Sequence, residues 1–152
     1  MSPALQRPHV LIVSDDSELT GFLGEGLVYA GFWTSVIASA VQALEVFRLR
    51  SFDVMVLDAA LGGIGALELL RRLRGRSDRA TTDERTDIPI VVVAASSSEL
   101  DPVLATSAGA DHVILAPIEL EHLAADLGRV VTAWRAAHPD RQWADEAVLG
   151  PA

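Results

Sequence analysis

The sequence contains no cysteine and no lysine. Without cysteine the chain can form neither a disulfide framework nor a thiolate metal site, a composition compatible with the cytoplasm. All 12 basic residues are therefore arginines, against 21 aspartates and glutamates. The net charge of −9 and the pI of about 4.7 would repel a nucleic-acid backbone, so we expect no direct binding of nucleic acid.

Long hydrophobic runs are also absent. The longest one, from Ile88 to Ala95, is interrupted by Pro89 and is much shorter than the roughly 20 residues of a membrane-spanning helix. The first eight residues contain no apolar stretch of the length found in signal peptides. We therefore expect a cytoplasmic protein without a membrane segment. Its 152 residues, 50% of them hydrophobic, are enough for one domain around one core.

A short apolar strand that runs directly into a carboxylate is the central feature of the chain. Residues 54–57 are uniformly apolar, which is typical of a strand buried on both faces of a parallel sheet, and Asp58 follows them. In open α/β sheets, ligands bind at the carboxyl ends of the strands. Asp58 by itself is better explained as a helix or turn cap than as a functional residue. The pair Asp15 and Asp16, at the end of another apolar strand, favours a functional site.

Hydrophobic periodicity and cap signals predict five strands alternating with five helices. We expect strands at 9–13, 34–38, 54–58, 90–95 and 113–115, and helices at about 17–30, 39–50, 66–74, 102–108 and 119–137. Ser96 and Glu99 offer a competing capping box for the fourth helix, but Pro102 would then lie inside that helix, so the start after Asp101 is preferred.

Right-handed crossovers turn this alternation into a (βα)5 doubly wound parallel sheet of the flavodoxin-like class, with strand order 2-1-3-4-5. Asp15, Asp16 and Asp58 then converge on one edge. Two carboxylates about 4 Å apart repel by roughly 4 kcal/mol at an effective dielectric constant near 20, so such a cluster binds a cation or holds a proton. Oxygen ligands without cysteine favour a hard ion such as Mg²⁺.

Several short motifs, in this order, resemble the receiver domain of bacterial two-component response regulators. They are Val13–Asp16, Leu57–Asp58 with Leu61 and Gly63, Leu67–Leu70, Ile88–Ile90, Gly109–Asp111 and Pro117. The resemblance spans residues 9–137. It leaves 1–8 as an N-terminal lead and 138–152 as a polar C-terminal tail, so we expect a stand-alone receiver without an output domain.

The resemblance implies a signalling module and not an enzyme. Asp58 would accept a phosphoryl group from a sensor histidine kinase or a histidine phosphotransfer protein. Asp15, Asp58 and the backbone carbonyl of Ala60 would ligate Mg²⁺, with Asp16 as a further candidate. The resemblance also implies a cis peptide bond between Ala116 and Pro117. A downstream protein partner would bind the face of the fourth helix, fifth strand and fifth helix.

The chain departs from the family pattern at four positions. Ser14 replaces an acid, Ala94 a serine or threonine, Val113 an aromatic switch residue and Ala116 a lysine. Losing the charge-assisted hydrogen bond of that lysine costs about 1.5–3 kcal/mol. We therefore predict an atypical receiver with an impaired phosphorylation switch.

Three alternatives to the impaired switch stay open. One is a conventional phosphoacceptor that passes its phosphoryl group along a relay. The second is a scaffold that works without phosphorylation, and the third is a sensor that binds a small ligand in the pocket left by the missing lysine and hydroxyl.

Overall fold

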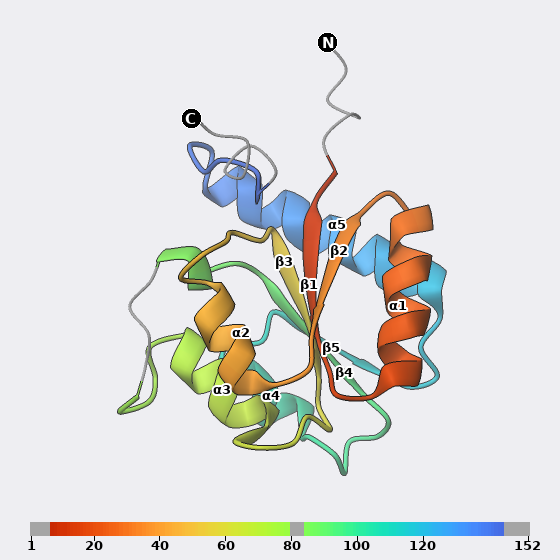
Figure 1. Ribbon diagram of the computed structural model, residues 1–152, viewed down its shortest axis with the longest axis vertical. Helices are drawn as coiled ribbons and strands as arrows, with labels where there is room; N and C mark the ends of the chain where they lie inside the picture. The colour runs from red at the N-terminus through yellow and green to blue at the C-terminus, as the bar shows by residue number, and fades with distance from the viewer. Residues whose placement is uncertain (1–6, 80–83, 145–152) are drawn as a thin grey trace.

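The computed structural model describes residues 7–79 and 84–144, in which five strands alternate with five helices (Figure 1). The strands are β1 (His9–Val13), β2 (Trp33–Ile37), β3 (Val54–Asp58), β4 (Ile90–Ala94) and β5 (His112–Leu115). The helices are α1 (Ser17–Tyr29), α2 (Ala40–Val46), α3 (Gly65–Leu73), α4 (Pro102–Ala108) and α5 (Leu120–Ala137), with a 3-10 turn η2 at Glu84–Thr86. All strand pairs are parallel, in the order β2-β1-β3-β4-β5, which confirms the predicted topology.

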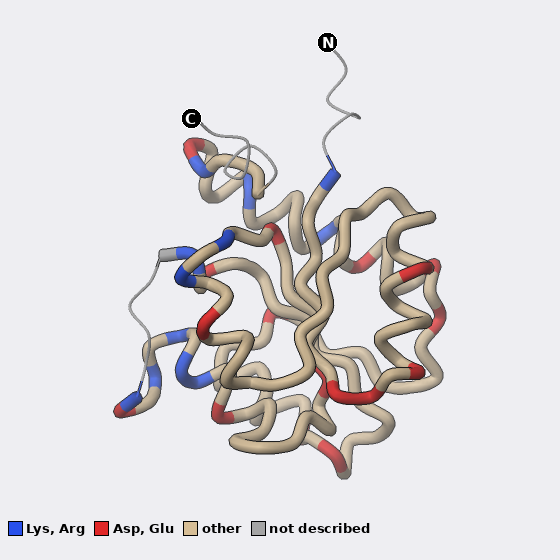
Figure 2. The backbone as a smooth tube through the Cα atoms, in the orientation of Figure 1, with Lys and Arg blue, Asp and Glu red and all other residues tan. Residues whose placement is uncertain are grey.

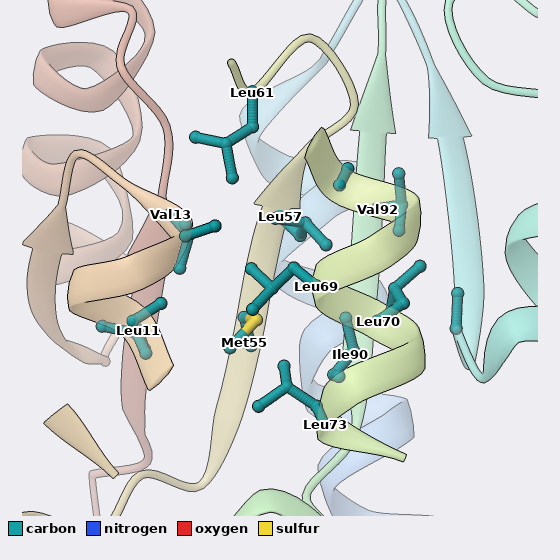
Figure 3. Packing of buried hydrophobic residues seen from close by; sticks show 14 of the residues in the cluster. Leu11, Val13, Met55, Leu57, Leu61, Leu69, Leu70, Leu73, Ile90 and Val92 are labelled. Carbon is teal, nitrogen blue, oxygen red and sulfur yellow. The ribbon is translucent and has the colours of Figure 1, made fainter. Parts of the chain in front are cut away.

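Helices cover both faces of the sheet, with α2, α3 and α4 on one face and α1 and α5 on the other (Figure 1). Side chains of the central strands alternate between the two faces, because successive residues of a strand point in opposite directions. Figure 3 shows Leu69, Leu70 and Leu73 of α3 directed at residues of β3 and β4. With both faces covered, every residue of β3 and β4 is buried, as the apolar runs predict.

Three predicted details of the helices differ from the structure. The second helix ends at Val46 and not near residue 50, because Arg48 and Leu49 donate to carbonyls only three residues earlier and close turns. Phe22 shares the helical spacing of Leu23 and Leu27, which predicts that it is buried, but it is 48% exposed, and only Leu23 and Leu27 of α1 are buried. Trp134 shares the helical spacing of Leu127 and Val131, which also predicts burial, but it is half-buried, and its indole N–H donates to the carbonyl of Asp87.

Other details are confirmed. Asp101 caps α4 by accepting the N–H of Val103 at 2.8 Å, so the later of the two helix starts is correct. The Ala116–Pro117 peptide bond is cis. Across residues 7–79 and 84–144, no helix is both long enough and apolar enough to cross a membrane.

The segment after α5 packs on the domain as far as the structure describes it. The guanidinium of Arg135 lies 3.7 Å from the centre of the Trp143 ring, and Ala144 is buried. These contacts lie at the amino end of β3, next to Asp53, whereas Asp58 lies at the carboxyl end of the same strand. The remainder of the predicted tail, 145–152, lies outside the described residues. So do residues 80–83, which belong to the polar segment 75–87 that the sequence predicts to be a surface loop.

Candidate functional site

The site lies where β1 and β3 end side by side. Val13 is paired with Leu57 in the parallel register, so the next residues, Ser14 and Asp58, are neighbours at the carboxyl edge. The hydroxyl of Ser14 donates to Oδ2 of Asp58 at 2.6 Å. Ser14 is 2% exposed and Asp58 is 6% exposed, so this hydrogen bond is shielded from bulk water.

The second oxygen of Asp58 is also engaged. Oδ1 accepts the backbone N–H of Ala60 at 2.9 Å, in the turn that follows β3. A buried carboxylate is costly unless it is paired or hydrogen-bonded, and these two donors supply one hydrogen bond to each of its oxygens. The carboxylate of Asp58 is therefore held in one orientation at the end of its strand.

Asp15 lies at the mouth of the site, and its side chain is exposed. Its Oδ2 accepts the N–H of Gly62 at 3.2 Å, which ties the loop after β1 to the loop after β3. A Cβ atom at Gly62 would lie 3.2 Å from that same oxygen, so this approach is close. Figure 2 shows the acidic residues that follow β1 at the lower end of the sheet.

The side chain of Asp16 caps helix α1. Its Oδ1 accepts the backbone N–H groups of Glu18 at 3.0 Å and Leu19 at 3.3 Å, so it is the N-cap of α1. The first turn of a helix leaves such N–H groups without partners inside the helix, and an aspartate satisfies them well. Of the two acids after β1, Asp15 is therefore the one whose carboxylate is tied to the loop that carries Ala60.

A cavity of about 390 Å³ opens beside Asp58. Its lining comprises Asp15, Asp16, Leu19, Asp58, Ala60, Val93, Ala94, Ala95, Glu99, Ala116 and Ile118. The lining combines acidic and apolar side chains, and within residues 7–79 and 84–144 it includes no arginine. Ala94 and Ala116 both line this cavity, so methyl groups stand at the two positions where the resemblance implies a hydroxyl and an ammonium group.

Glu99 was not predicted as part of the site. Its Oε1 accepts the N–H of Ala95 at 2.6 Å, and its own N–H donates to the carbonyl of Ser96 at 3.1 Å. The Ser96–Glu99 capping box noted in the sequence was the available signal, since it predicts a tight turn directly after β4. The turn does not start α4, but it places a carboxylate at the cavity.

The oxygen atoms around the cavity match the ligands that Mg²⁺ prefers. Asp15, Asp58 and Ala60 line one cavity and offer only oxygen ligands. In the part of the chain that the structure describes, no three acidic or histidine side chains are grouped closely enough to hold a metal ion alone. Mg²⁺ commonly binds through one or two carboxylates together with water and phosphate oxygens, and the residues present fit that mode.

The histidines stay outside this site. Nε2 of His112 lies 3.3 Å from Oδ2 of Asp126, and Nδ1 of His122 lies 3.3 Å from Oε2 of Glu119. Val113, at the position of the expected aromatic switch residue, is half-buried in β5 and packs against the core under α2, α3 and α4.

Comparisons with known proteins agree on one family. The family model described as "response regulator receiver domain" matches residues 10–127. The chain is 31% identical over 140 residues to the sensory transduction protein RegX3 of Mycolicibacterium smegmatis, covering 92% of this chain and 57% of the relative. It is 34% identical over 119 residues to the DNA-binding response regulator MtrA of Mycolicibacterium paratuberculosis, covering 78% of this chain and 49% of the relative. The chain thus spans about half the length of the curated relatives it matches.

Solved structures show the same fold. A CheY-like receiver domain protein of Methanospirillum hungatei superposes with a TM-score of 0.75 at 20% identity, covering 87% of this chain and 99% of that one. The receiver domain of the sensor histidine kinase PA1611 of Pseudomonas aeruginosa superposes with a TM-score of 0.71 at 18% identity, covering 84% and 99%. That structure is described with a magnesium ion coordinated in the active site cleft.

Proposed function

Because the chain belongs to the response regulator receiver family, a signalling module of two-component systems and not an enzyme, we propose that Asp58 is its phosphoacceptor. The observation that carries this proposal is the buried, oriented carboxylate of Asp58 beside Asp15, above a cavity of about 390 Å³. A sensor histidine kinase or a histidine phosphotransfer protein would supply the phosphoryl group.

The transfer is a substitution at phosphorus. One oxygen of the Asp58 carboxylate forms a bond to phosphorus while the bond from phosphorus to the donor nitrogen breaks, and that nitrogen keeps the electron pair and takes up a proton. The product is an acyl phosphate on Asp58. We propose that Asp15, Asp58 and the backbone carbonyl of Ala60 hold Mg²⁺, which when bound neutralises charge on the phosphoryl oxygens. Asp16 contributes mainly as the cap of α1.

We propose further that phosphorylation is poorly relayed to the rest of the domain. A phosphoryl group on Asp58 would face the methyl groups of Ala94 and Ala116, which offer it no hydrogen bond, and none of the described residues that line the cavity is an arginine. The face of α4, β5 and α5 would bind a downstream protein, and Val103, Leu104 and Leu115 are exposed apolar residues on it. Because the usual contacts to α4 and β5 are missing, this face would keep nearly one conformation.

Intact-protein mass spectrometry after incubation with a small phosphoryl donor and Mg²⁺ tests the acceptor. We expect one phosphoryl group on the wild type and none on Asp58→Asn, which keeps the shape of the side chain but is a poor nucleophile. No uptake by the wild type would contradict the proposal. Amide NMR spectra with and without a phosphoryl mimic test the relay, and widespread shifts in α4, β5 and α5 would refute the impaired switch.

A second function is favoured by the same cavity. With small side chains at positions 94 and 116, the space of about 390 Å³ has an apolar wall that suits a small ligand. A sensor of this kind would be stabilised against heat by its ligand, since binding to the folded state alone raises the melting temperature. A metabolite panel that produces no shift with any compound would count against it.

A further inference from the structure

Ser14 stands where the family pattern has an acid, and its hydroxyl contacts the carboxylate of Asp58. We infer that Ser14 is a positioning residue whose hydroxyl stabilises the free carboxylate of Asp58 and so disfavours the phosphorylated form. This inference rests on the proposed function of Asp58. It concerns the balance between the free and phosphorylated states and not the identity of the acceptor.

The geometry of the contact supports this role. The Ser14 hydroxyl oxygen lies 2.6 Å from Asp58 Oδ2, within the short range expected when a hydroxyl donates to an ionised carboxylate. Ser14 is 2% and Asp58 6% exposed, so bulk water competes little with this hydrogen bond. The same hydroxyl oxygen accepts the N–H of Asp16 at 3.1 Å, which orients its proton towards Asp58.

The chemistry of the acyl phosphate then sets the direction of the effect. Whichever oxygen of Asp58 forms the bond to phosphorus, the carboxylate loses its full negative charge, and Oδ2 becomes an ester or carbonyl oxygen. Hydrogen bonds to charged acceptors are stronger than those to neutral ones. The Ser14 hydroxyl therefore stabilises Asp58 before the transfer more than after it, which favours passing the phosphoryl group on.

The site also differs electrostatically from one with an acid at position 14. A carboxylate there would repel the charge of Asp58 and make the empty site depend on a cation. The serine is neutral and donates a hydrogen bond instead. Asp58 thus accepts one hydrogen bond on each oxygen, from the hydroxyl of Ser14 and from the backbone N–H of Ala60.

The test is the ratio of phosphorylated to free protein at steady state, measured by intact mass at saturating Mg²⁺ and a fixed donor concentration. We expect Ser14→Ala to raise this ratio about tenfold, the amount expected for a charge-assisted hydrogen bond made in one state only. A ratio equal to or below that of the wild type would overturn the inference. A lower ratio would mean that the hydroxyl serves the phosphoryl group.

A matched pair separates the hydroxyl from packing. Ser14→Thr and Ser14→Val place side chains of the same shape at this position and differ only in the hydroxyl. The ratio of phosphorylated to free protein should therefore be about tenfold higher for Ser14→Val than for Ser14→Thr, while the two variants have similar melting temperatures. Equal ratios for the two variants would overturn the inference even if Ser14→Ala fails to fold. If the wild type and all variants stay unphosphorylated, the proposed function fails and this inference fails with it.

A double-mutant cycle gives a reading that needs no phosphorylation. The unfolding equilibrium constant is measured for the wild type, Ser14→Ala, Asp58→Asn and the double variant. The effect of the double substitution on this constant should differ about tenfold from the product of the two single effects. Independent, additive effects would show that the Ser14 hydroxyl does not stabilise the ionised carboxylate, and would overturn the inference while leaving the proposed acceptor intact.

Discussion

The backbone N–H of Ala144 donates to the carboxylate of Asp53 at 3.0 Å, across 91 positions of the chain. Oδ2 of Asp53 accepts the N–H of His9 at 2.7 Å. A guanidinium nitrogen of Arg135 lies 3.9 Å from Oδ1, the oxygen that accepts from Ala144. Asp53 is 5% exposed. One buried carboxylate therefore fastens both the start of β1 and the segment after α5 to the amino end of β3.

Replacing Asp53 by alanine should destabilise the domain by about 3 kcal/mol, because buried donors from two segments lose their charged acceptor. Urea unfolding followed by circular dichroism measures the loss. Asp78→Ala, which removes an exposed carboxylate from the surface loop, is the matched control and should change stability by less than about 0.5 kcal/mol. Equal effects of the two substitutions would show that the contacts of Asp53 contribute nothing.

A second buried charge joins α3 to the loops before β4 and β5. The guanidinium of Arg74 donates to the carbonyls of Gly109 and Thr86 and to the carboxylate of Asp111, each at 3.0 Å. Burial lowers the pKa of Arg74, which the carboxylate of Asp111 partly opposes. The arrangement leaves no room beside Gly109, where a Cβ atom would overlap the Arg74 side chain.

Gly109→Ala should therefore cost about 3 kcal/mol, since it combines backbone strain at a φ of 120° with displacement of Arg74. Gly31→Ala is the control, because Gly31 has a φ of 105° but no neighbour within 4 Å of a Cβ atom, so it should cost only about 1–2 kcal/mol of strain. Thermal and urea unfolding of both variants give the comparison. If Gly109→Ala lowers the free energy of unfolding no more than Gly31→Ala does, overlap with the Arg74 side chain contributes nothing to the loss.

Asp16→Ala should lower stability by about 1 kcal/mol through loss of the N-cap of α1, and should leave the Mg²⁺ dependence of phosphoryl uptake unchanged. Asp16→Asn keeps the cap and removes the charge, so it should match the wild type in both measurements. Asp15→Asn should raise the Mg²⁺ concentration required for uptake. If Asp16→Asn did the same, Asp16 would be a metal ligand.

Acid should weaken one ion pair of α3. Hydrogen bonds from Arg72 and Ser77 lower the pKa of Glu68 below its usual 4.5. A lowered folded-state pKa stabilises the protein above the unfolded value, and the contribution disappears as the pH falls through the folded value. The melting temperature of the wild type should exceed that of Glu68→Gln at pH 6 and approach it below pH 4.5. A constant difference between pH 7 and pH 3 would contradict this.

The amino-acid sequence was enough to predict the order and type of the elements. Uniformly apolar residues at 54–57 and 90–94 and amphipathic helices between the strands leave few topologies other than a doubly wound parallel sheet, since crossovers are right-handed. Once β1 and β3 are neighbours, Asp15 and Asp58 must meet at the same edge. The sequence contains no lysine, so a lysine is excluded from every position of the site.

The partner of each polar side chain, in contrast, is known only from the tertiary structure. The sequence offered Asp16 as a candidate Mg²⁺ ligand, and in the fold its carboxylate accepts the N–H groups of Glu18 and Leu19 and caps α1. Neither the Ser14–Asp58 contact nor the Asp53–Ala144 contact has a local pattern, since the partners are 44 and 91 positions apart. Such pairs depend on strand register and on how the last helix packs, and both are set by burial of the whole core.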